Sequence, residues 1–394
     1  MINPKELIKT LSIEDLNRTA DQYFKSIPDI TEQIRKPFHS FVEAPESLQS
    51  VGHLLAGLRL GKTMTVLDFA AGTCWLSRLL TQLQCQTISC DVSAAALEHG
   101  KHLFSEYPVT SNLISKPEFL LFDGHTLNLP SESVDRIICH DGFHHIPNQR
   151  EVISELARVL KPGGIAGFSE PGRFHSQSPQ SQYEMKNYAV LENDIILPEI
   201  YAIALEQGFT DMRVKLLSDM EISLENYQDL TNAKLSTELG SAIENNIRSV
   251  MTDKTIFFLQ KGEFVPDSRS HIGLSHSIST TSISLSTKSG KALHIPLSIT
   301  NTGTAEWLSQ NIHDIGVVRI GTHLYDARGN LLDLDFTRHS LNKAIKPGET
   351  FEQEIALEPT EPGHYTLSTD LVSESICWFE TAGSTAIDIE LDVS

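Results

Sequence analysis

Three aspartates, Asp68, Asp91 and Asp123, each stand at or just after the end of a short apolar run. If these runs are parallel strands of one sheet, their carboxyl ends meet at one edge, where ligands of such sheets bind. We expect Asp91 to accept hydrogen bonds from both hydroxyls of a ribose, and Asp123 from the amino group of an adenine. A helix cap or a turn is the plain alternative for each acid. Their recurrence after three successive strands favours the ligand site.

The turn that follows Asp68 indicates which ligand is bound. Ala70, Ala71 and Gly72 are small, so the backbone can approach a ligand, and a helix that begins near Trp75 offers free N–H groups. A nicotinamide dinucleotide needs a glycine at the position of Trp75, and Asp68 would repel its pyrophosphate. A zwitterionic, sulfonium-bearing amino acid tolerates a carboxylate. The turn therefore favours S-adenosylmethionine, with a tight turn that binds no ligand as the plain alternative.

Histidines and a glutamate follow the next two strands, where a reaction on that cofactor would take place. Methyl transfer needs the nucleophile in line at about 3 Å, and a hydroxyl acceptor also needs a base. His144 and His145 follow the fourth strand and titrate in the useful range, so we predict them as candidate bases. Glu170 and His175, after the fifth strand, are candidates for a base and for contact with the acceptor. A structural role is the alternative for all four.

The stretch 176–194 is unusually polar and lies where an acceptor pocket would be built. Hydroxyl-rich acceptors need many directional hydrogen bonds, and we expect Tyr183 and Asn187 to supply some of them. A solvated loop is the alternative. No ligand spacing in the sequence demands a metal ion, and we expect none.

Seven apolar runs predict the strands that position these side chains. They are 64–69, 86–90, 118–122, 136–140, 165–169, 212–217 and 255–260. Helical patterns separate most of them, notably 46–60 and 149–160, and 220–250 is typical of additional helix. The basic, proline and glycine residues of 161–164 are expected to stop the second of these helices. Strands that alternate with helices predict an α/β, Rossmann-like sheet of seven strands.

After Gly262 the character of the chain changes. Ser and Thr become dense, helical periodicity disappears, and short alternating runs such as 292–299, 317–321 and 364–368 begin. This pattern predicts an all-β, immunoglobulin-like sandwich. We therefore expect an N-terminal helical segment that covers the cofactor cleft (1–45), the α/β domain (46–262), a linker (263–272) and the sandwich (273–394).

Composition excludes several classes of function. Of the 394 residues, 31 are Lys or Arg and 51 are Asp or Glu, which gives a formal charge of −20. Such a field repels nucleic-acid phosphates and anionic membrane surfaces. The five cysteines form no C-x-x-C pair, and no apolar run approaches the roughly 18 residues of a membrane span. We expect a soluble, unprocessed, cytoplasmic protein without nucleic-acid or membrane partners, and leave a homodimer open.

From about residue 45 to 262 the chain resembles the class I S-adenosylmethionine-dependent methyltransferases, especially the branch of the ubiquinone/menaquinone-biosynthesis enzymes. The resemblance rests on the segments 68–74, 123–130, 133–137, 143–145 and 156–164. The first motif of that family reads acidic-x-Gly-x-Gly-x-Gly, so Ala70 and Cys74 replace two of its glycines. With the turn described above, the resemblance implies a methyltransferase whose cofactor contacts are Asp68, Ala70, Gly72, Cys74, Trp75, Asp91, Val92, Asp123, Gly124 and His140.

Part of the second domain, about 310–380, resembles sandwich modules attached to bacterial polysaccharide-processing and export proteins. Aromatic residues of the whole second domain could stack on sugars, although aromatics in a sandwich are more often core. They are Trp307, Tyr325, Phe336, Trp378 and Phe379. We predict O-methylation of a sugar or glycan hydroxyl, with the sandwich aiding acceptor binding. The alternatives are a methyltransferase for a small lipophilic or natural-product acceptor, and a non-catalytic binding or scaffold protein that keeps the cofactor fold.

Overall fold

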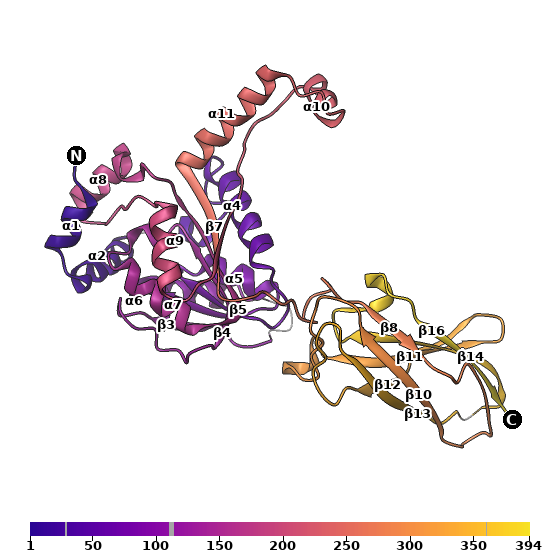
Figure 1. The fold of residues 1–394 in the computed structure, drawn as a ribbon. Coiled ribbons are helices and arrows are strands. Elements are labelled where there is room, and N and C mark those ends of the chain that lie inside the picture. The colour runs from indigo at the N-terminus through magenta and orange to yellow at the C-terminus, as the bar shows by residue number, and fades with distance from the viewer. Residues whose placement is uncertain (28–29, 110–113, 360) are drawn as a thin grey trace. The chain divides into compact units, whose positions relative to one another are not determined.

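The structure is a computed structural model, and it describes residues 1–27, 30–109, 114–359 and 361–394. The chain divides into two compact units (Figure 1). The first unit holds residues 1–60 and 64–264, and the second holds residues 61–63 and 265–394. Within the described residues, every α-helix belongs to the first unit, and the second is built from strands and short 3₁₀ turns.

One seven-stranded sheet organises the first unit. Its strands are β1 (Thr65–Phe69), β2 (Gln86–Asp91), β3 (Glu118–Leu121), β4 (Val134–His140), β5 (Leu160–Pro171), β6 (Asp211–Val214) and β7 (Lys254–Gln260). Their order is β3-β2-β1-β4-β5-β7-β6. The predicted Rossmann-like α/β class is confirmed. The sheet is mixed, however, because β7 runs antiparallel to both β5 and β6. An apolar run has the same pattern in either direction of the chain. The sequence therefore does not show whether a strand is parallel or antiparallel to its neighbours.

The order of the strands reverses beside β1. From β1 the chain moves outward to β2 and β3, then returns to the other side of β1 with β4. In the parallel register Phe69 is opposite Cys90, which brings the ends of β1 and β2 together. A crevice forms at such a reversal, outside the carboxyl ends of the strands. The acids and the small-residue turn predicted to bind a cofactor follow these ends.

Helices cover both faces of the sheet. They are α4 (Glu43–Leu58), α5 (Trp75–Gln82), α6 (Ala94–Glu106), α7 (Gln149–Val159), α8 (Pro179–Tyr188), α9 (Leu197–Glu206), α10 (Leu224–Thr231) and α11 (Thr237–Asp253). Successive residues of a strand point to opposite faces. Val66 thus packs in one core with Leu54 of α4, and Leu67 packs in the other with Leu156 of α7. Burial on both faces is why the strands are continuously apolar.

The expected stop of the helix over 149–160 is confirmed, but the residues that follow it already belong to a strand. The helix ends at Val159, and Leu160 already begins β5, so 161–164 belongs to the strand rather than to a loop. Leu160 pairs with Val134, and the register shifts before Arg136 pairs with Ile165. The proline and glycines are accommodated by this irregular start of β5.

Three helices precede α4: α1 (Pro4–Thr10), α2 (Ile13–Ser26) and α3 (Thr31–Arg35). Ser12 and Asp15 form a reciprocal capping box that fixes the start of α2. Further along α2, Asp21 Oδ1 accepts hydrogen bonds from Ala95 N–H (2.9 Å) and Ser93 Oγ (3.0 Å). These groups stand at the start of α6, where a carboxylate is favoured by the helix dipole. The N-terminal segment is therefore held against the first turn of α6.

The second unit is two sheets with one core between them. Its strands are β8 (His276–Ser279), β9 (Ser284–Thr287), β10 (Leu293–Asn301), β11 (Val318–Asp326), β12 (Leu331–Ser340), β13 (Thr350–Leu357), β14 (Gly363–Ser373), β15 (Cys377–Trp378) and β16 (Ile387–Val393). One sheet has the order β13-β10-β8 and the other β12-β11-β14-β16-β9, with β15 beside β14. Leu297 of the first sheet and Leu371 of the second share the core. The all-β prediction is confirmed.

The aromatic residues of this unit divide between core and surface. Trp307 and Phe379 are fully buried, whereas Tyr325, Phe336 and Trp378 are half-buried. In the part of the chain that the structure describes, no helix combines the length and the apolar character that crossing a membrane requires.

Candidate functional site

A cavity of about 380 Å³ lies at the carboxyl ends of β1, β2 and β4. Of the predicted cofactor residues, those that line it are Ala70, Gly72, Trp75, Asp91, Val92, Gly124 and His140. Three others, Asp68, Cys74 and Asp123, lie outside its lining. Of the three acids at the strand ends, Asp91 therefore lines the cavity and the other two do not.

The loop between β1 and α5 is shaped by left-handed backbone. Ala70, Gly72 and Cys74 have φ values of 58°, 53° and 60°. Gly72 adopts this conformation without strain, whereas Ala70 and Cys74 are held in it by their surroundings. Cys74 is fully buried, and a Cβ on Gly100 of α6 would lie only 2.3 Å from its Sγ. Close packing of α6 thus presses the loop into the shape that borders the cavity.

Asp91 joins this loop to the start of α6. Its Oδ2 accepts a hydrogen bond from Gly72 N–H, and its Oδ1 accepts one from Ser93 N–H, both at 2.8 Å. Burial raises the pKa of Asp91, while these backbone donors act in the opposite direction. Each oxygen can accept a second hydrogen bond from a group in the cavity.

Asp68 lies beneath the loop rather than in the cavity. Its Oδ2 accepts a hydrogen bond of 2.6 Å from the hydroxyl of Ser77, which itself accepts one from Ser89. The side chain is buried, and burial raises its pKa to about 7, with a smaller contribution from the charge of Asp91. In this arrangement Asp68 fastens α5 to the sheet. Direct contact with the cofactor stays a prediction for this residue.

Asp68→Asn should stabilise the first unit at pH 8. In the folded protein the pKa of Asp68 is about 7, against an ordinary value of 3.8. Between these values the folded chain binds more protons than the unfolded one, so the free energy of unfolding falls as pH rises. The neutral amide keeps the hydrogen bond from Ser77 and removes the charge. We expect a gain of roughly 2–4 kcal/mol at pH 8 and almost none at pH 4.

Urea unfolding at both pH values, followed by far-ultraviolet circular dichroism, measures this effect. The helical signal reports the first unit, since the described helices all lie there. Equal dependence of stability on pH in Asp68→Asn and in the unchanged chain would contradict the prediction.

Asp123 turns the chain after β3. Its Oδ1 accepts hydrogen bonds from His125 N–H (2.7 Å) and Thr126 N–H (2.8 Å), and these donors lower its pKa. Its carbonyl oxygen accepts a hydrogen bond from Asn17 of α2. The residue is exposed and stands outside the cavity lining, which Gly124 reaches. Contact of Asp123 with an adenine stays a prediction.

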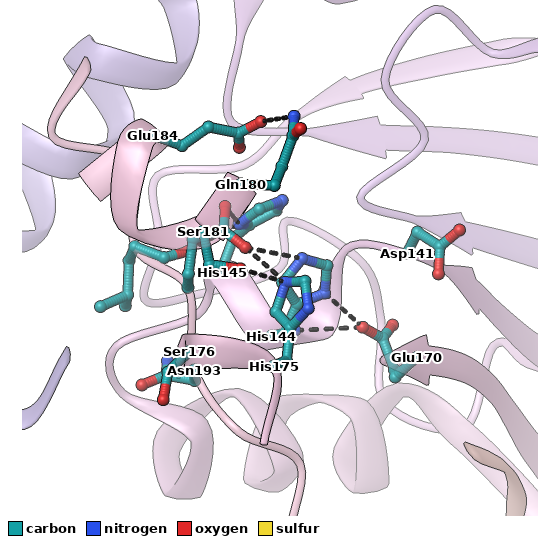
Figure 2. A network of polar contacts seen from close by, with 12 residues as sticks. Asp141, His144, His145, Glu170, His175, Ser176, Gln180, Ser181, Glu184 and Asn193 are labelled. Carbon is teal, nitrogen blue, oxygen red and sulfur yellow. Dashed lines mark hydrogen bonds and ion pairs between the residues drawn. The ribbon is translucent and has the colours of Figure 1, made fainter. Parts of the chain in front are cut away.

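A cluster of histidines and carboxylates lies next to the cavity (Figure 2). His144 belongs to a 3₁₀ turn after β4, and Glu170 lies at the end of β5, with no exposed surface. The Nδ1–H of His144 donates to Glu170 Oε2 at 2.7 Å. Glu170 also accepts hydrogen bonds from the backbone N–H groups of Gly142, Phe143 and His144. Glu170 thus fixes both the turn and the His144 ring.

Glu192 and His175 complete the cluster. The Nε2–H of His175 donates to Glu192 Oε2 at 2.6 Å, and His144 Nε2 lies 3.7 Å from the same oxygen. The Nδ1–H of His145 donates to the backbone carbonyl of Leu191 at 2.7 Å. Figure 2 shows the three imidazole rings gathered together with Glu170 beside His144. The predicted residues His144, His145, Glu170 and His175 are therefore brought together.

The pKa values of the two adjacent histidines are shifted in opposite directions. Burial alone would lower the pKa of His144, but the hydrogen bond and the charge of Glu170 outweigh burial and raise it. For His145 the burial of part of the ring and then the neighbouring His144 lower the pKa. The His145 side chain keeps 41% of its surface exposed and lines the cavity. At neutral pH it presents an uncharged ring whose Nε2 can accept a proton.

Two predicted acceptor contacts lie elsewhere on α8. Tyr183 and Asn187 are exposed, stand outside the cavity lining, and are joined by a hydrogen bond from Asn187 Nδ2 to the carbonyl of Tyr183. Glu184 of the same helix reaches the cavity instead. The sequence predicted only a polar stretch here. A polar stretch without helical periodicity does not show which residues face the cavity. Acceptor contact by Tyr183 and Asn187 stays a prediction.

The N-terminal segment, which we expect from the sequence to cover the cleft, supplies lining residues that no motif predicts. Leu16, Asn17, Tyr23 and Phe24 of α2 line the cavity, as does Lys36 after α3. The sequence carries a signal for α2, since Ser12 and Asp15 have the spacing of a capping box. The sequence carries no signal that shows which residues of α2 face the cavity.

Part of the first unit is similar to known proteins. Residues 67–168 match the family described as methyltransferase domain. The chain is 29% identical over 119 residues to the ubiquinone/menaquinone biosynthesis C-methyltransferase of Coxiella burnetii. It is 30% identical over 123 residues to that of Pseudomonas savastanoi pv. phaseolicola. The two alignments cover 29% and 30% of this chain and 46% of each relative, so the chain spans about half the length of the curated relatives it matches.

Among solved structures, the chain is similar to phosphoethanolamine N-methyltransferase 2 of Haemonchus contortus in complex with phosphomonomethylethanolamine and S-adenosylhomocysteine. The identity is 20% and the TM-score 0.44, over 65% of this chain and 61% of that one.

Proposed function

We propose that this chain, which carries a methyltransferase domain with S-adenosylmethionine as its cofactor, methylates a hydroxyl of a sugar or glycan. The observation that carries the proposal is the position of His145. Its ring lines the same cavity as Asp91 and the loop after β1. A group that can take a proton thus faces the space that holds the methyl donor.

The cavity fits the cofactor in charge and in shape. Asp91 offers two carboxylate oxygens with free lone pairs, which suit the hydroxyls of a ribose. Gly72 has a positive φ and no side chain, so the backbone beside Asp91 is open to a ligand. We propose that Asp91, Gly72 and Val92 hold the nucleoside part, and that Trp75 and His140 border the rest. When bound, the cofactor supplies an electrophilic methyl group.

The chain's own residues would orient the acceptor and take its proton. The Nδ1–H of His145 is used by the carbonyl of Leu191, so Nε2 carries the lone pair. A hydroxyl placed beside Nε2 can give up its proton as the oxygen attacks the methyl carbon. Glu170 keeps His144 fixed behind this ring, with ring centroids 3.9 Å apart. Positioning of this kind supplies much of the rate of a group transfer.

Polar side chains in the cavity support a hydroxyl-rich acceptor. Gln33, Lys36 and Glu43 from the N-terminal segment, and Glu184 from α8, line it together with His145. Such groups provide directional hydrogen bonds that an apolar acceptor would leave unpaired. In the second unit, the Trp378 ring already packs against the guanidinium of Arg338 (4.3 Å from the ring centroid to Cζ) and the ring of His323 (4.0 Å between centroids), so it is not offered as a sugar-stacking face. We propose that the second unit as a whole aids the binding of a glycan.

The test uses the full chain, cofactor with a labelled methyl group, and a panel of nucleotide sugars, oligosaccharides and quinols. We expect label on a sugar hydroxyl, and we expect His145→Ala to lower kcat by about 100-fold. The affinity for S-adenosylmethionine, measured by calorimetry, should stay unchanged in this variant.

Label on quinols alone would overturn the sugar assignment. This outcome would favour a lipophilic acceptor, for which the apolar side chains of Leu16 and Phe24 in the cavity are the supporting observation. Binding of the cofactor without transfer to any member of the panel, and without release of S-adenosylhomocysteine, would favour the scaffold alternative.

A further inference from the structure

We propose that His144, His145 and Glu192 form a binding site for one divalent transition-metal cation, of which Zn²⁺ is the representative. The sequence carries no spacing that predicts such a site, because Glu192 follows the histidines by more than 45 residues. Within the described residues, these three are the group of His, Cys, Asp and Glu donors close enough to share an ion. The inference stands on this geometry and does not depend on the acceptor.

The spacing of the donors suits a metal ion. One ligand atom from each residue can be chosen so that all lie within 4.8 Å of one another. His144 Nε2 and Glu192 Oε2 are 3.7 Å apart, which is long for a hydrogen bond. In a tetrahedral site with bonds of about 2.0–2.1 Å, two ligand atoms are about 3.4 Å apart. Small adjustments of the side chains would close the site around an ion.

Both histidine rings are held in the tautomer that a metal requires. His144 donates its Nδ1–H to Glu170, and His145 donates its Nδ1–H to the carbonyl of Leu191. The two Nε2 atoms therefore keep lone pairs for coordination, whereas the nitrogen of His145 that lies near Glu192 is Nδ1, 3.5 Å from Oε1. A histidine ligand whose other nitrogen is bonded to a carboxylate or a carbonyl is the usual outer arrangement of protein metal sites.

Glu192 is a buried carboxylate, and one of its oxygens lacks a hydrogen-bond donor. Its side chain is only 3% exposed, and its Oε1 has no hydrogen-bond partner in the described structure. Oε2 accepts the hydrogen bond from His175, which orients the carboxylate as a ligand. A buried carboxylate oxygen without a donor costs free energy, and a cation supplies the missing interaction.

The donor set indicates which metal would bind. Two imidazoles and one carboxylate suit Zn²⁺ and its neighbours in the first transition row, whereas Mg²⁺ prefers oxygen ligands alone. Three protein ligands leave at least one coordination position open, as in catalytic zinc sites. Because His145 lines the cavity, we expect the open position to face it. With an ion bound, the Nε2 lone pair of His145 is used in coordination, so the ion rather than the free imidazole would activate an acceptor hydroxyl at this position. This consequence alone rests on the proposed function.

The experiment measures metal binding by the full chain without cofactor or acceptor. Protein stripped with a chelator is titrated calorimetrically with ZnCl₂ and, separately, with MgCl₂. We expect one Zn²⁺ per chain and no comparable binding of Mg²⁺. Co²⁺ used in place of Zn²⁺ should give visible absorption bands of a four- or five-coordinate site with nitrogen ligands.

Matched variants locate the ion. Glu192→Gln and His145→Ala should each weaken Zn²⁺ binding at least about 10-fold. The control is His125→Ala, since His125 is an exposed histidine that also lies between two carboxylates, Glu14 and Glu151. Its loss should leave the affinity unchanged. Circular dichroism checks folding, and the exposed His145 provides a second variant if the buried Glu192 does not tolerate replacement.

Absence of Zn²⁺ binding would overturn the inference, as would binding that neither cluster variant weakens. Binding lost only in His125→Ala would place the ion elsewhere and equally overturn it. None of these outcomes depends on methyl transfer, so failure of the proposed function and failure of the metal site are distinguishable.

Discussion

Asp91→Ala is expected to weaken the binding of S-adenosylmethionine by about 100-fold. The carboxylate lines the cavity and holds Gly72 and Ser93 by hydrogen bonds of 2.8 Å. If Asp91 accepts both ribose hydroxyls as proposed, the substitution removes two charge-assisted bonds to the ligand, and it also frees the loop that the carboxylate positions. With about 1.5 kcal/mol for each bond to the ligand, the loss is about 3 kcal/mol. Calorimetric titration of the full chain gives the dissociation constant directly.

The matched control is Asp388→Ala, which removes an exposed carboxylate from β16 in the second unit. It changes the net charge equally, so it accounts for long-range electrostatics. Unaltered cofactor affinity in Asp91→Ala would refute the assignment of this residue. A comparable loss in both variants would point to net charge as the cause.

Glu170→Gln is expected to destabilise the first unit by about 2–4 kcal/mol. Both oxygens of this fully buried carboxylate accept hydrogen bonds, from Gly142 and Phe143 N–H on one and from His144 N–H and Nδ1–H on the other. A glutamine keeps one acceptor and turns an NH₂ group toward the remaining donors. Each buried donor left unpaired costs about 1–3 kcal/mol. Urea unfolding followed by circular dichroism measures the change.

Glu98→Gln is the control for this experiment, because Glu98 is an exposed residue of α6 whose salt bridge with Lys101 is on the surface. Exposed pairs of this kind contribute up to about 1 kcal/mol. If Glu170→Gln unfolds at the same urea concentration as the unchanged chain, the carboxylate does not hold the 3₁₀ turn. The distinction between buried and exposed carboxylates would then fail for this site.

The cavity edge could be predicted from local features of the sequence. Short apolar runs followed by acids and small residues indicated strands whose ends meet, and the pairing of Phe69 with Cys90 brings two of those ends together. Ala70 and Gly72 line the cavity, as a small-residue turn requires. Trp75, which argued against a dinucleotide, lines it as well. These features depend on residues close in the chain, where periodicity and turn chemistry act.

The roles of the three acids could not be separated in this way. Asp68 and Asp91 have the same side chain and similar positions at strand ends, yet Asp68 bonds to Ser77 beneath the loop and Asp91 borders the cavity. Asp123 instead bonds to backbone groups of its own turn. Which direction a strand-end side chain takes depends on the helix that packs above it, and sequence spacing does not record that packing.

The sequence by itself determined the α/β sheet, the strand-rich second unit and the loop that borders the cofactor cavity, because hydrophobic period and small-residue turns are local properties. Only the tertiary structure decided which residues of α2 line the cavity and that Glu192 meets His144, His145 and His175. These groups come from separate elements. Their approach follows from how helices pack on the sheet, which is a property of the whole core rather than of any segment.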